Sequence, residues 1–344
     1  MFDFIPSENC MMSANPIVHE QLVNQQTYSW DLPFTHIAQE HLDTMSPEEL
    51  DNNWHLSDFF GTVAVINLPQ DTARLDRITK ELNAIGTYDF EVFPAIDGRK
   101  DLDPSLWMKL KKNRLSNIDA KEKKNILDRL HQGEAGCYMS HYLLLKQTKE
   151  AFDRAQNELK SAKYVMDELA ILNATNKVRK YSRILILEDD SGFGVVNAAM
   201  SNSSTKNLGL LLREALKTLP RNWDMLYLMC APHEKTKKIS PHLYKLKRSV
   251  FANAYVVNYT MYEPILSTLK QIEDPEINEV LPVDKAISRL HYKYNVYAIY
   301  PSLAFQFDGV STIDSISNPK LKQCQPILKK KVVKKVRNNH LHTF

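Results

Sequence analysis

The chain has few cysteines, no long apolar run and almost no excess of charge, and each shortage excludes a class of protein. Its four cysteines among 344 residues lie far apart, without a CxxC or a Cys/His spacing. The sequence therefore predicts neither a zinc site nor a disulfide framework and fits a reducing compartment. Nowhere do about eighteen apolar residues run together, as a membrane-spanning helix requires. Because the N-terminus also lacks the basic and apolar regions of a secretory signal, we expect a soluble, cytoplasmic protein.

Positive and negative charges nearly cancel, since 44 Lys and Arg against 41 Asp and Glu leave a formal charge of +3. This is too little to argue for nucleic acid as a partner of the whole surface. Residues 329–337, however, hold five lysines and an arginine among valines. A solvated tail, a nucleic-acid patch and a contact with anionic lipid are alternatives there. The solvated tail is the safest interpretation. If the segment has a function we prefer lipid, and so expect a peripheral contact with the inner face of a membrane and no nucleic acid.

Composition divides the chain into three parts. Residues 1–58 are polar and rich in Asn, Gln and His, and we expect an N-terminal extension. Residues 59–318 alternate apolar runs of strand length with helical periods, which predicts one α/β domain. Within it, residues 150–180 are polar and helix-prone and predict a helical insertion. Residues 319–344 form the basic tail.

A strand, a helix and a second strand open the domain. Residues 62–68 have a strand pattern, apolar residues at helical spacing follow from Leu75 to Ile85, and residues 90–93 supply the next strand. Ligands of such α/β sheets sit beyond the carboxyl ends of the strands. The residues at those ends are Asn67 with the loop to Arg74, then Asp97 and Gly98.

Two glycine-containing segments carry further predictions. Residues 133–141 have two glycines before an apolar helical pattern, which predicts a helix start whose free N–H groups suit an anion. His141 lies inside that helix, where a structural histidine and a ligand are alternatives. Residues 191–194, with the sequence Ser-Gly-Phe-Gly, predict a flexible loop.

Residues 183–190 hold the strongest chemical signal. Four apolar residues predict a strand buried on both faces, and three carboxylates follow it. Adjacent negative charges repel unless a cation or solvent takes them up. If the chain stays extended, Glu188 and Asp190 point to one side and Asp189 to the other. Two carboxylates on one side suit Mg²⁺ or Mn²⁺, whereas an acidic loop after a strand is the more common alternative.

Several motifs occur in the order in which one enzyme family has them. They are residues 66–68 with Arg74 and Arg77, then residues 95–98, 133–141, 186–190, 282–284 and 301–306. Together they resemble family 25 glycosyltransferases, which include lipooligosaccharide β-galactosyltransferases and collagen galactosyltransferases. The likeness covers about residues 60–315, and the Gly-Glu-Ala-Gly-Cys-Tyr-Met-Ser-His and Leu-Glu-Asp-Asp segments are its most specific parts.

The resemblance implies an A-type glycosyltransferase fold (GT-A), with a Rossmann-like nucleotide-binding sheet and flanking helices. It also implies a UDP-sugar donor and a Mn²⁺ or Mg²⁺ ion on the donor diphosphate, with Glu188 and Asp190 as metal ligands. Asp189 would lie near the donor ribose or sugar. The other implied donor contacts are Asn67, Leu68, Arg74, Asp97, Gly98, Gly136, Ser140, His141 and Gln306.

The implied reaction moves a hexose, galactose or glucose, to a glycan or lipopolysaccharide-type acceptor with inversion at the anomeric carbon. Inversion needs one base for the acceptor hydroxyl, and Asp284 is our candidate, although an acid in a first helical turn also complements the helix dipole. The alternative function is an inactive nucleotide-sugar or glycan-binding protein whose basic tail contacts a membrane or a partner. A metal-dependent phosphohydrolase would use the same carboxylates but would not need the donor-binding segments.

Overall fold

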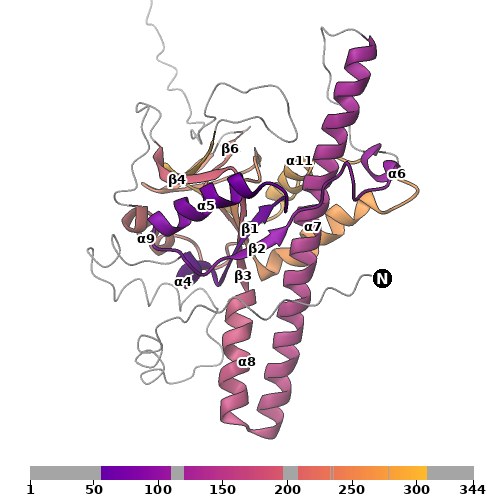
Figure 1. Ribbon diagram of the computed structural model, residues 1–344. Coiled ribbons are helices and arrows are strands. Elements are labelled where there is room, and N and C mark those ends of the chain that lie inside the picture. Colours follow the sequence, from indigo (N-terminus) through magenta and orange to yellow (C-terminus); the bar gives the residue numbers. More distant parts are fainter. Residues whose placement is uncertain are drawn as a thin grey trace, which may run out of the picture.

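The computed structural model describes residues 56–109, 120–196, 208–232, 234, 236–277 and 279–307. The expected N-terminal extension up to residue 55 and the basic tail lie outside this part of the chain. The described residues form a mixed α/β fold, in which one large sheet lies between two sets of helices (Figure 1). This agrees with the alternation of strand and helix patterns in the sequence.

Eight strands form the main sheet, in the order β2-β1-β3-β10-β5-β11-β8-β7. β1 is parallel to both β2 and β3, whereas β10 runs antiparallel to both β3 and β5. In sheet order the strands are β2 (Glu91–Pro94), β1 (Thr62–Asn67), β3 (Arg183–Glu188), β10 (Ala254–Asn258), β5 (Met225–Tyr227), β11 (Val296–Ile299), β8 (Leu243–Lys245) and β7 (Lys237–Ser240). The predicted βαβ unit is confirmed as β1, α5 and β2.

Helices cover both faces of the sheet. Residues of α4, α5 and α9 pack on one face, and residues of α7, α10 and α11 pack on the other. The α-helices are α4 (Leu56–Phe60), α5 (Thr72–Ala84), α6 (Pro104–Trp107), α7 (Ala120–Val165), α8 (Glu168–Tyr181), α9 (Leu208–Lys217), α10 (Tyr262–Leu269) and α11 (Val283–Ser288). There are also short 3-10 helices, η1 (Tyr259–Met261), η2 (Lys270–Ile272) and η3 (Leu290–Tyr292), and a strand pair, β6 (Ala231–Pro232) and β9 (Ser249–Val250).

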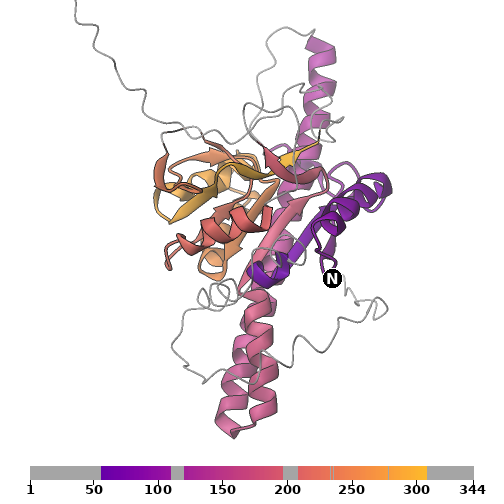
Figure 2. The ribbon, with the colours of Figure 1, turned by 90° about the vertical axis from the view of Figure 1, so that its left-hand side faces the viewer.

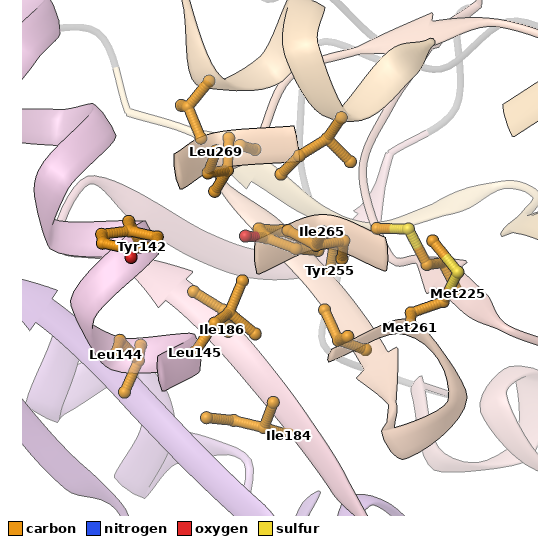
Figure 3. Packing of buried hydrophobic residues seen from close by; sticks show 14 of the residues in the cluster. Tyr142, Leu144, Leu145, Ile184, Ile186, Met225, Tyr255, Met261, Ile265 and Leu269 are labelled. Atoms are coloured by element: carbon orange, nitrogen blue, oxygen red, sulfur yellow. The ribbon is translucent and has the colours of Figure 1, made fainter. Parts of the chain in front are cut away.

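The alternation of side chains along β3 decides which helix each residue meets. Ile184 and Ile186 belong to the core on the α7 side, where they lie among side chains of α7, α10 and β10 (Figure 3). Leu185 and Leu187 belong to the core on the α5 side. All four side chains are fully buried, so the predicted strand buried on both faces is confirmed. Continuing the alternation directs Glu188 toward α7.

The segment of residues 133–141 lies in the middle of α7, and the predicted helix start before it is wrong. Glycine is unfavourable inside a helix, but Gly136 serves a close contact with the loop after β2. A Cβ at this position would lie 2.5 Å from the backbone oxygen of Ile96. The anion site expected of a helix N-terminus is therefore absent from residues 133–141. Beyond the sheet, α7 continues alongside α8, so that residues 150–180 lie in this helical pair (Figures 1 and 2).

Two other expectations from local composition are wrong. Residues 191–194 are not a loop but part of β4 (Ser191–Val196), which pairs antiparallel with β12 (Ser302–Gln306). Gly192 makes room there for the Phe305 ring, since a Cβ on Gly192 would lie 2.6 Å from it. Cys230 is disulfide-bonded, which the spacing of the cysteines did not indicate.

Candidate active site at the carboxyl end of β3

The three carboxylates at the end of β3 meet side chains from β1, α5, α7 and β12 and from Asn253, just before β10. Asp189 and Asp190 are buried, and the Glu188 side chain keeps 21% of its surface exposed. Because β1 is parallel to β3 and Ile66 is paired with Glu188, the residue that ends β1 lies beside the acidic motif. The site therefore forms where the carboxyl ends of two parallel strands meet, as the sequence predicted.

Arg74 and Asn67 bind the two aspartates. Arg74 lies in the first turn of α5, whose N-cap is Asp71, and its Nη1 is 2.7 Å from Asp189 Oδ1. Its Nη2 is 3.2 Å from Asp190 Oδ2, so one guanidinium bridges both carboxylates. Asn67 Nδ2 donates to Asp189 Oδ2 over 2.8 Å. Asp189 is thus held by side chains from β1 and α5, away from α7.

Asn253 and Gln306 hold the other oxygens of the motif. Asn253 Nδ2 donates over 3.0 Å both to Glu188 Oε2 and to Asp190 Oδ1. Gln306, at the end of β12, donates to Asp190 Oδ2 over 3.0 Å. Gln306 was predicted, whereas Asn253 was missed. The sequence shows only that Asn253 stands just before the apolar strand β10. The antiparallel pairing of β10 with β3 is what brings Asn253 to the acidic motif.

Glu188 meets two side chains of α7. His141 Nε2 lies 3.2 Å from Glu188 Oε1, and the Cys137 thiol lies 3.7 Å from the same oxygen. On its other side, His141 Nδ1 lies 2.9 Å from the hydroxyl of Tyr255, a residue of β10. His141 is fully buried, so both of its ring nitrogens have partners within the protein. The His141 side chain therefore fixes the orientation of Glu188.

Burial acts strongly on the two aspartates. It raises the pKa of Asp189 to about 6, although the Arg74 charge and the Asn67 hydrogen bond both lower it. Burial, followed by the charge of Glu188, also raises the pKa of Asp190, against the opposing effects of Gln306, Arg74 and Asn253. The ionised forms of both aspartates are therefore disfavoured by burial, and a further cation beside them would favour these forms.

Asp284 lies in the first turn of α11, as predicted. One of its oxygens accepts from the Lys285 N–H over 2.7 Å, and the other lies 3.5 Å from the Phe251 nitrogen. Burial raises the pKa values of Cys137 and Tyr227, and the negative charge of Asp284 adds to both shifts. Both Asp284 oxygens therefore face backbone N–H groups, one within α11 and one at Phe251.

Five predicted donor contacts lie instead around the junction between α7 and the loops after β1 and β2. Ser140 Oγ accepts from the Ile96 N–H over 2.9 Å and donates to the Gly136 carbonyl over 2.7 Å. A Cβ on Gly98 would lie 1.8 Å from the Gln132 carbonyl oxygen. Asp97 Oδ1 accepts from the Arg99 N–H, and the carbonyl of Leu68 accepts from the Asp71 N–H. The contacts of Ser140 and Gly98 join α7 to the loop after β2 and so help to position Cys137 and His141.

The residues present fit a divalent cation. Asp189 and Asp190 share the guanidinium of Arg74, and Glu188 adds a third negative charge beside them, so negative charge stays in excess around buried groups. Carboxylate oxygens are the ligands that Mg²⁺ and Mn²⁺ prefer, and Glu188 and Asp190 each turn an oxygen toward Asn253. A softer set lies on the other side of Glu188. The ligand atoms of Cys137, His141 and Glu188 all lie within 4.8 Å of one another.

Comparison with known proteins gives one family. Among the described helices, none combines the length and apolar character that crossing a membrane requires. No curated protein matches the chain. The resemblance drawn from the motifs is confirmed for residues 60–154, which match the model of the family described as glycosyltransferase family 25 (LPS biosynthesis protein).

Proposed function

We propose that the protein is a metal-dependent glycosyltransferase of A-type fold. It would move a hexose, galactose or glucose, from a UDP-sugar to a glycan or lipopolysaccharide-type acceptor, with inversion. One observation carries this proposal. The segment that matches the family model contributes Asn67, Arg74 and His141, and each of them contacts the acidic motif, which lies outside that segment. The family-like segment and the carboxylates thus form one site.

Glu188 and Asp190 are the residues that would hold Mn²⁺ or Mg²⁺. Such an ion supplies positive charge to a leaving diphosphate, which becomes more negative as the glycosidic bond breaks. Asn253 and Gln306 orient the two carboxylates through the hydrogen bonds described above. Arg74 holds Asp189 and Asp190 together and adds a fixed positive charge. The protein's own part is therefore a preorganised, partly buried set of charges.

Asp284 is the proposed base. An inverting transfer needs one group to take the proton of the acceptor hydroxyl, and a carboxylate can do so. Asp284 is half-buried and lies in the first turn of α11. The acceptor would then enter between α11 and the acidic motif. An anionic membrane contact through residues 329–337 remains part of this proposal, because it would hold a glycolipid acceptor near the site.

The proposal is tested by measuring UDP release from a panel of UDP-sugars with glycan acceptors, in the presence of Mn²⁺, Mg²⁺ or a chelator. The wild type is compared with Asp190→Asn and with Asp76→Asn, a matched control on the exposed face of α5. We expect release from one donor that requires the cation, is lost in Asp190→Asn and persists in Asp76→Asn.

Other results would point to other functions. UDP binding without turnover of any donor would favour an inactive nucleotide-sugar-binding protein. Phosphate release without an acceptor would favour a phosphohydrolase. Turnover that ignores both the chelator and Asp190→Asn would contradict the proposed use of the carboxylates.

A further inference from the structure

We propose that Cys137, His141 and Glu188 form a binding site for a borderline divalent cation such as Zn²⁺ or Co²⁺. This site is distinct from the pair of hard oxygen ligands formed by Glu188 and Asp190. The proposal rests on the positions of the three side chains and holds whether or not the protein transfers a sugar. It also reverses the expectation, drawn from cysteine spacing alone, that the chain has no zinc site.

The fold places two of these ligands on one face of α7. Cys137 and His141 are four residues apart, and residues at this spacing lie above one another on a helix. This face packs against β3, where alternation directs Glu188 toward α7 as it does Ile184 and Ile186. The third ligand therefore comes from a strand that the sequence places far from the helix.

The distances agree with a small tetrahedral ion. Zinc bonds of about 2.0 to 2.3 Å around a tetrahedron place neighbouring donor atoms about 3.3 to 3.7 Å apart. In the protein, His141 Nε2 and Glu188 Oε1 are 3.2 Å apart, and Cys137 Sγ and the same oxygen are 3.7 Å apart. Small shifts of these side chains would thus suffice to seat the ion.

The donor types select the class of ion. A thiolate, an imidazole and a carboxylate are typical ligands of Zn²⁺, whereas Mg²⁺ prefers oxygen alone. Three protein ligands leave a fourth position of a tetrahedral ion for water or another group. The exposed fraction of the Glu188 side chain, 21%, gives this position a route to solvent.

Two further residues orient the ligands. Tyr255 contacts His141 Nδ1 over 2.9 Å, and Asn253 holds Glu188 Oε2 over 3.0 Å. Partners of this kind fix ring orientation and ligand direction in metal sites. A tyrosine hydroxyl both donates and accepts, so Tyr255 is able to support either tautomer of His141.

Binding of the ion requires one net proton to leave. The thiol of Cys137 would lose its proton to solvent, because the thiolate is the metal ligand. His141 would carry its proton on Nδ1 and donate a hydrogen bond from there to the Tyr255 hydroxyl. Its Nε2 would then be free of a proton and face the ion. Neither change moves an electron, and no oxidant or reductant is needed.

Glu188 presents its two oxygens to different surroundings, which makes the two sites separable. Oε1 faces His141 and Cys137, whereas Oε2 shares Asn253 with Asp190. Cys137→Ser should therefore weaken binding of the softer ion and spare Mn²⁺. Asp190→Asn should do the reverse.

The test is a titration of the full chain with Co²⁺, followed by absorption, and with Zn²⁺, followed by calorimetry. We expect a thiolate-to-cobalt charge-transfer band in the wild type and in Asp190→Asn, but not in Cys137→Ser. Zinc affinity should fall at least about 100-fold in Cys137→Ser and about 10- to 100-fold in Tyr255→Phe, which removes only the partner of His141. Zinc should also raise the unfolding temperature of the wild type but not of Cys137→Ser.

Two results would overturn the proposal. One is the absence of a thiolate band in the wild type at saturating Co²⁺. The other is a band that persists unchanged in Cys137→Ser, because the thiolate would then come from another cysteine. Circular dichroism before each titration shows whether a variant is folded, and Cys137→Ala replaces Cys137→Ser if the serine variant is not.

Discussion

One helix, α7, passes through two different environments. Where it crosses the sheet, in residues 133–148, which we name the crossing segment, Tyr138 and His141 are 1% and 0% exposed. Where it pairs with α8 beyond the sheet, in residues 158–166, which we name the hairpin end, Tyr164 is 89% exposed. Ser140 and His141 of the crossing segment have partners in other elements, whereas charges near the hairpin end pair within the helical pair, as Lys177 does with Glu158. The candidate active site therefore lies beside the buried part of α7.

The largest contrast should come from removing one negative charge that contacts the crossing segment, Glu188, and one that lies in the hairpin end, Glu158. We expect Glu188→Gln to lower UDP-sugar turnover about 1000-fold, as loss of one element of charge stabilisation does. Glu158→Gln, which breaks the exposed pair with Lys177, should leave turnover unchanged. Steady-state kinetics measures both. Equal effects of the two variants would show that the two regions do not differ in function.

A substitution of Asp284, the proposed base, tests the candidate active site from another side. If it is the base, Asp284→Asn should lower kcat about 100-fold or more with little change in the donor KM. The donor KM is the useful control, because the proposed base acts on the acceptor. A variant that raises the donor KM and keeps kcat would instead place Asp284 in donor binding.

The close contact of Gly136 should give the next largest effect, on stability. A methyl group at this position would meet the Ile96 carbonyl at 2.5 Å, so the loop or the helix must shift. We expect Gly136→Ala to lower the free energy of unfolding by about 3 kcal/mol, against its gain in helix propensity. Urea unfolding measures this. A stabilised variant would mean that α7 and the loop after β2 do not approach so closely.

The helix register around Gly136 shows what the sequence could and could not predict. The strand before the carboxylates, the βαβ unit and the place of Asn67 at a strand end followed from local patterns, whereas Gln306 was named only through the family resemblance. The course of α7 through residues 133–141 did not, because helix propensity is weak and the contact with Ile96 outweighs it. For the same reason β4 was missed, since its partner β12 lies far along the chain.

Asn253 and Tyr255 were beyond reach for a further reason. Both flank or form an ordinary apolar strand, and nothing in their neighbours marks them as polar partners of Glu188 and His141. Their place depends on the antiparallel register of β10 against β3, which aligns Tyr255 with Ile186. A single sequence does not determine that register.

A pH-dependent stability should arise behind the crossing segment, where the rings of His141, Tyr255, Tyr227 and His291 contact one another in turn. Burial lowers the pKa of His291 from 6.5 to about 4. Between these values the unfolded chain binds a proton that the folded protein does not, so stability falls as pH drops through this window.

We expect His291 to account for a loss of about 2 kcal/mol between about pH 7 and about pH 5. Urea unfolding of the wild type and His291→Gln at both pH values measures it, because the variant should lack this part of the pH dependence. The same pH dependence in both proteins would show that His291 does not keep its neutral form on folding.

The smallest effect should come from the hairpin end. Tyr164→Ser replaces a highly exposed ring, so the unfolding free energy should change by no more than about 0.5 kcal/mol. Turnover should not change. A clear loss of activity with a glycolipid acceptor, and not with a soluble one, would assign the hairpin end a role in acceptor binding.

The central claim is that the carboxylates after β3, together with residues of the family-like segment, bind a UDP-sugar through a divalent cation. Calorimetry of UDP binding with Mn²⁺ and with a chelator, in the wild type and Asp190→Asn, tests it most directly. We predict that Mn²⁺ strengthens UDP binding in the wild type and has no effect in Asp190→Asn. Equal UDP affinity with Mn²⁺ and with chelator in the wild type would contradict the claim.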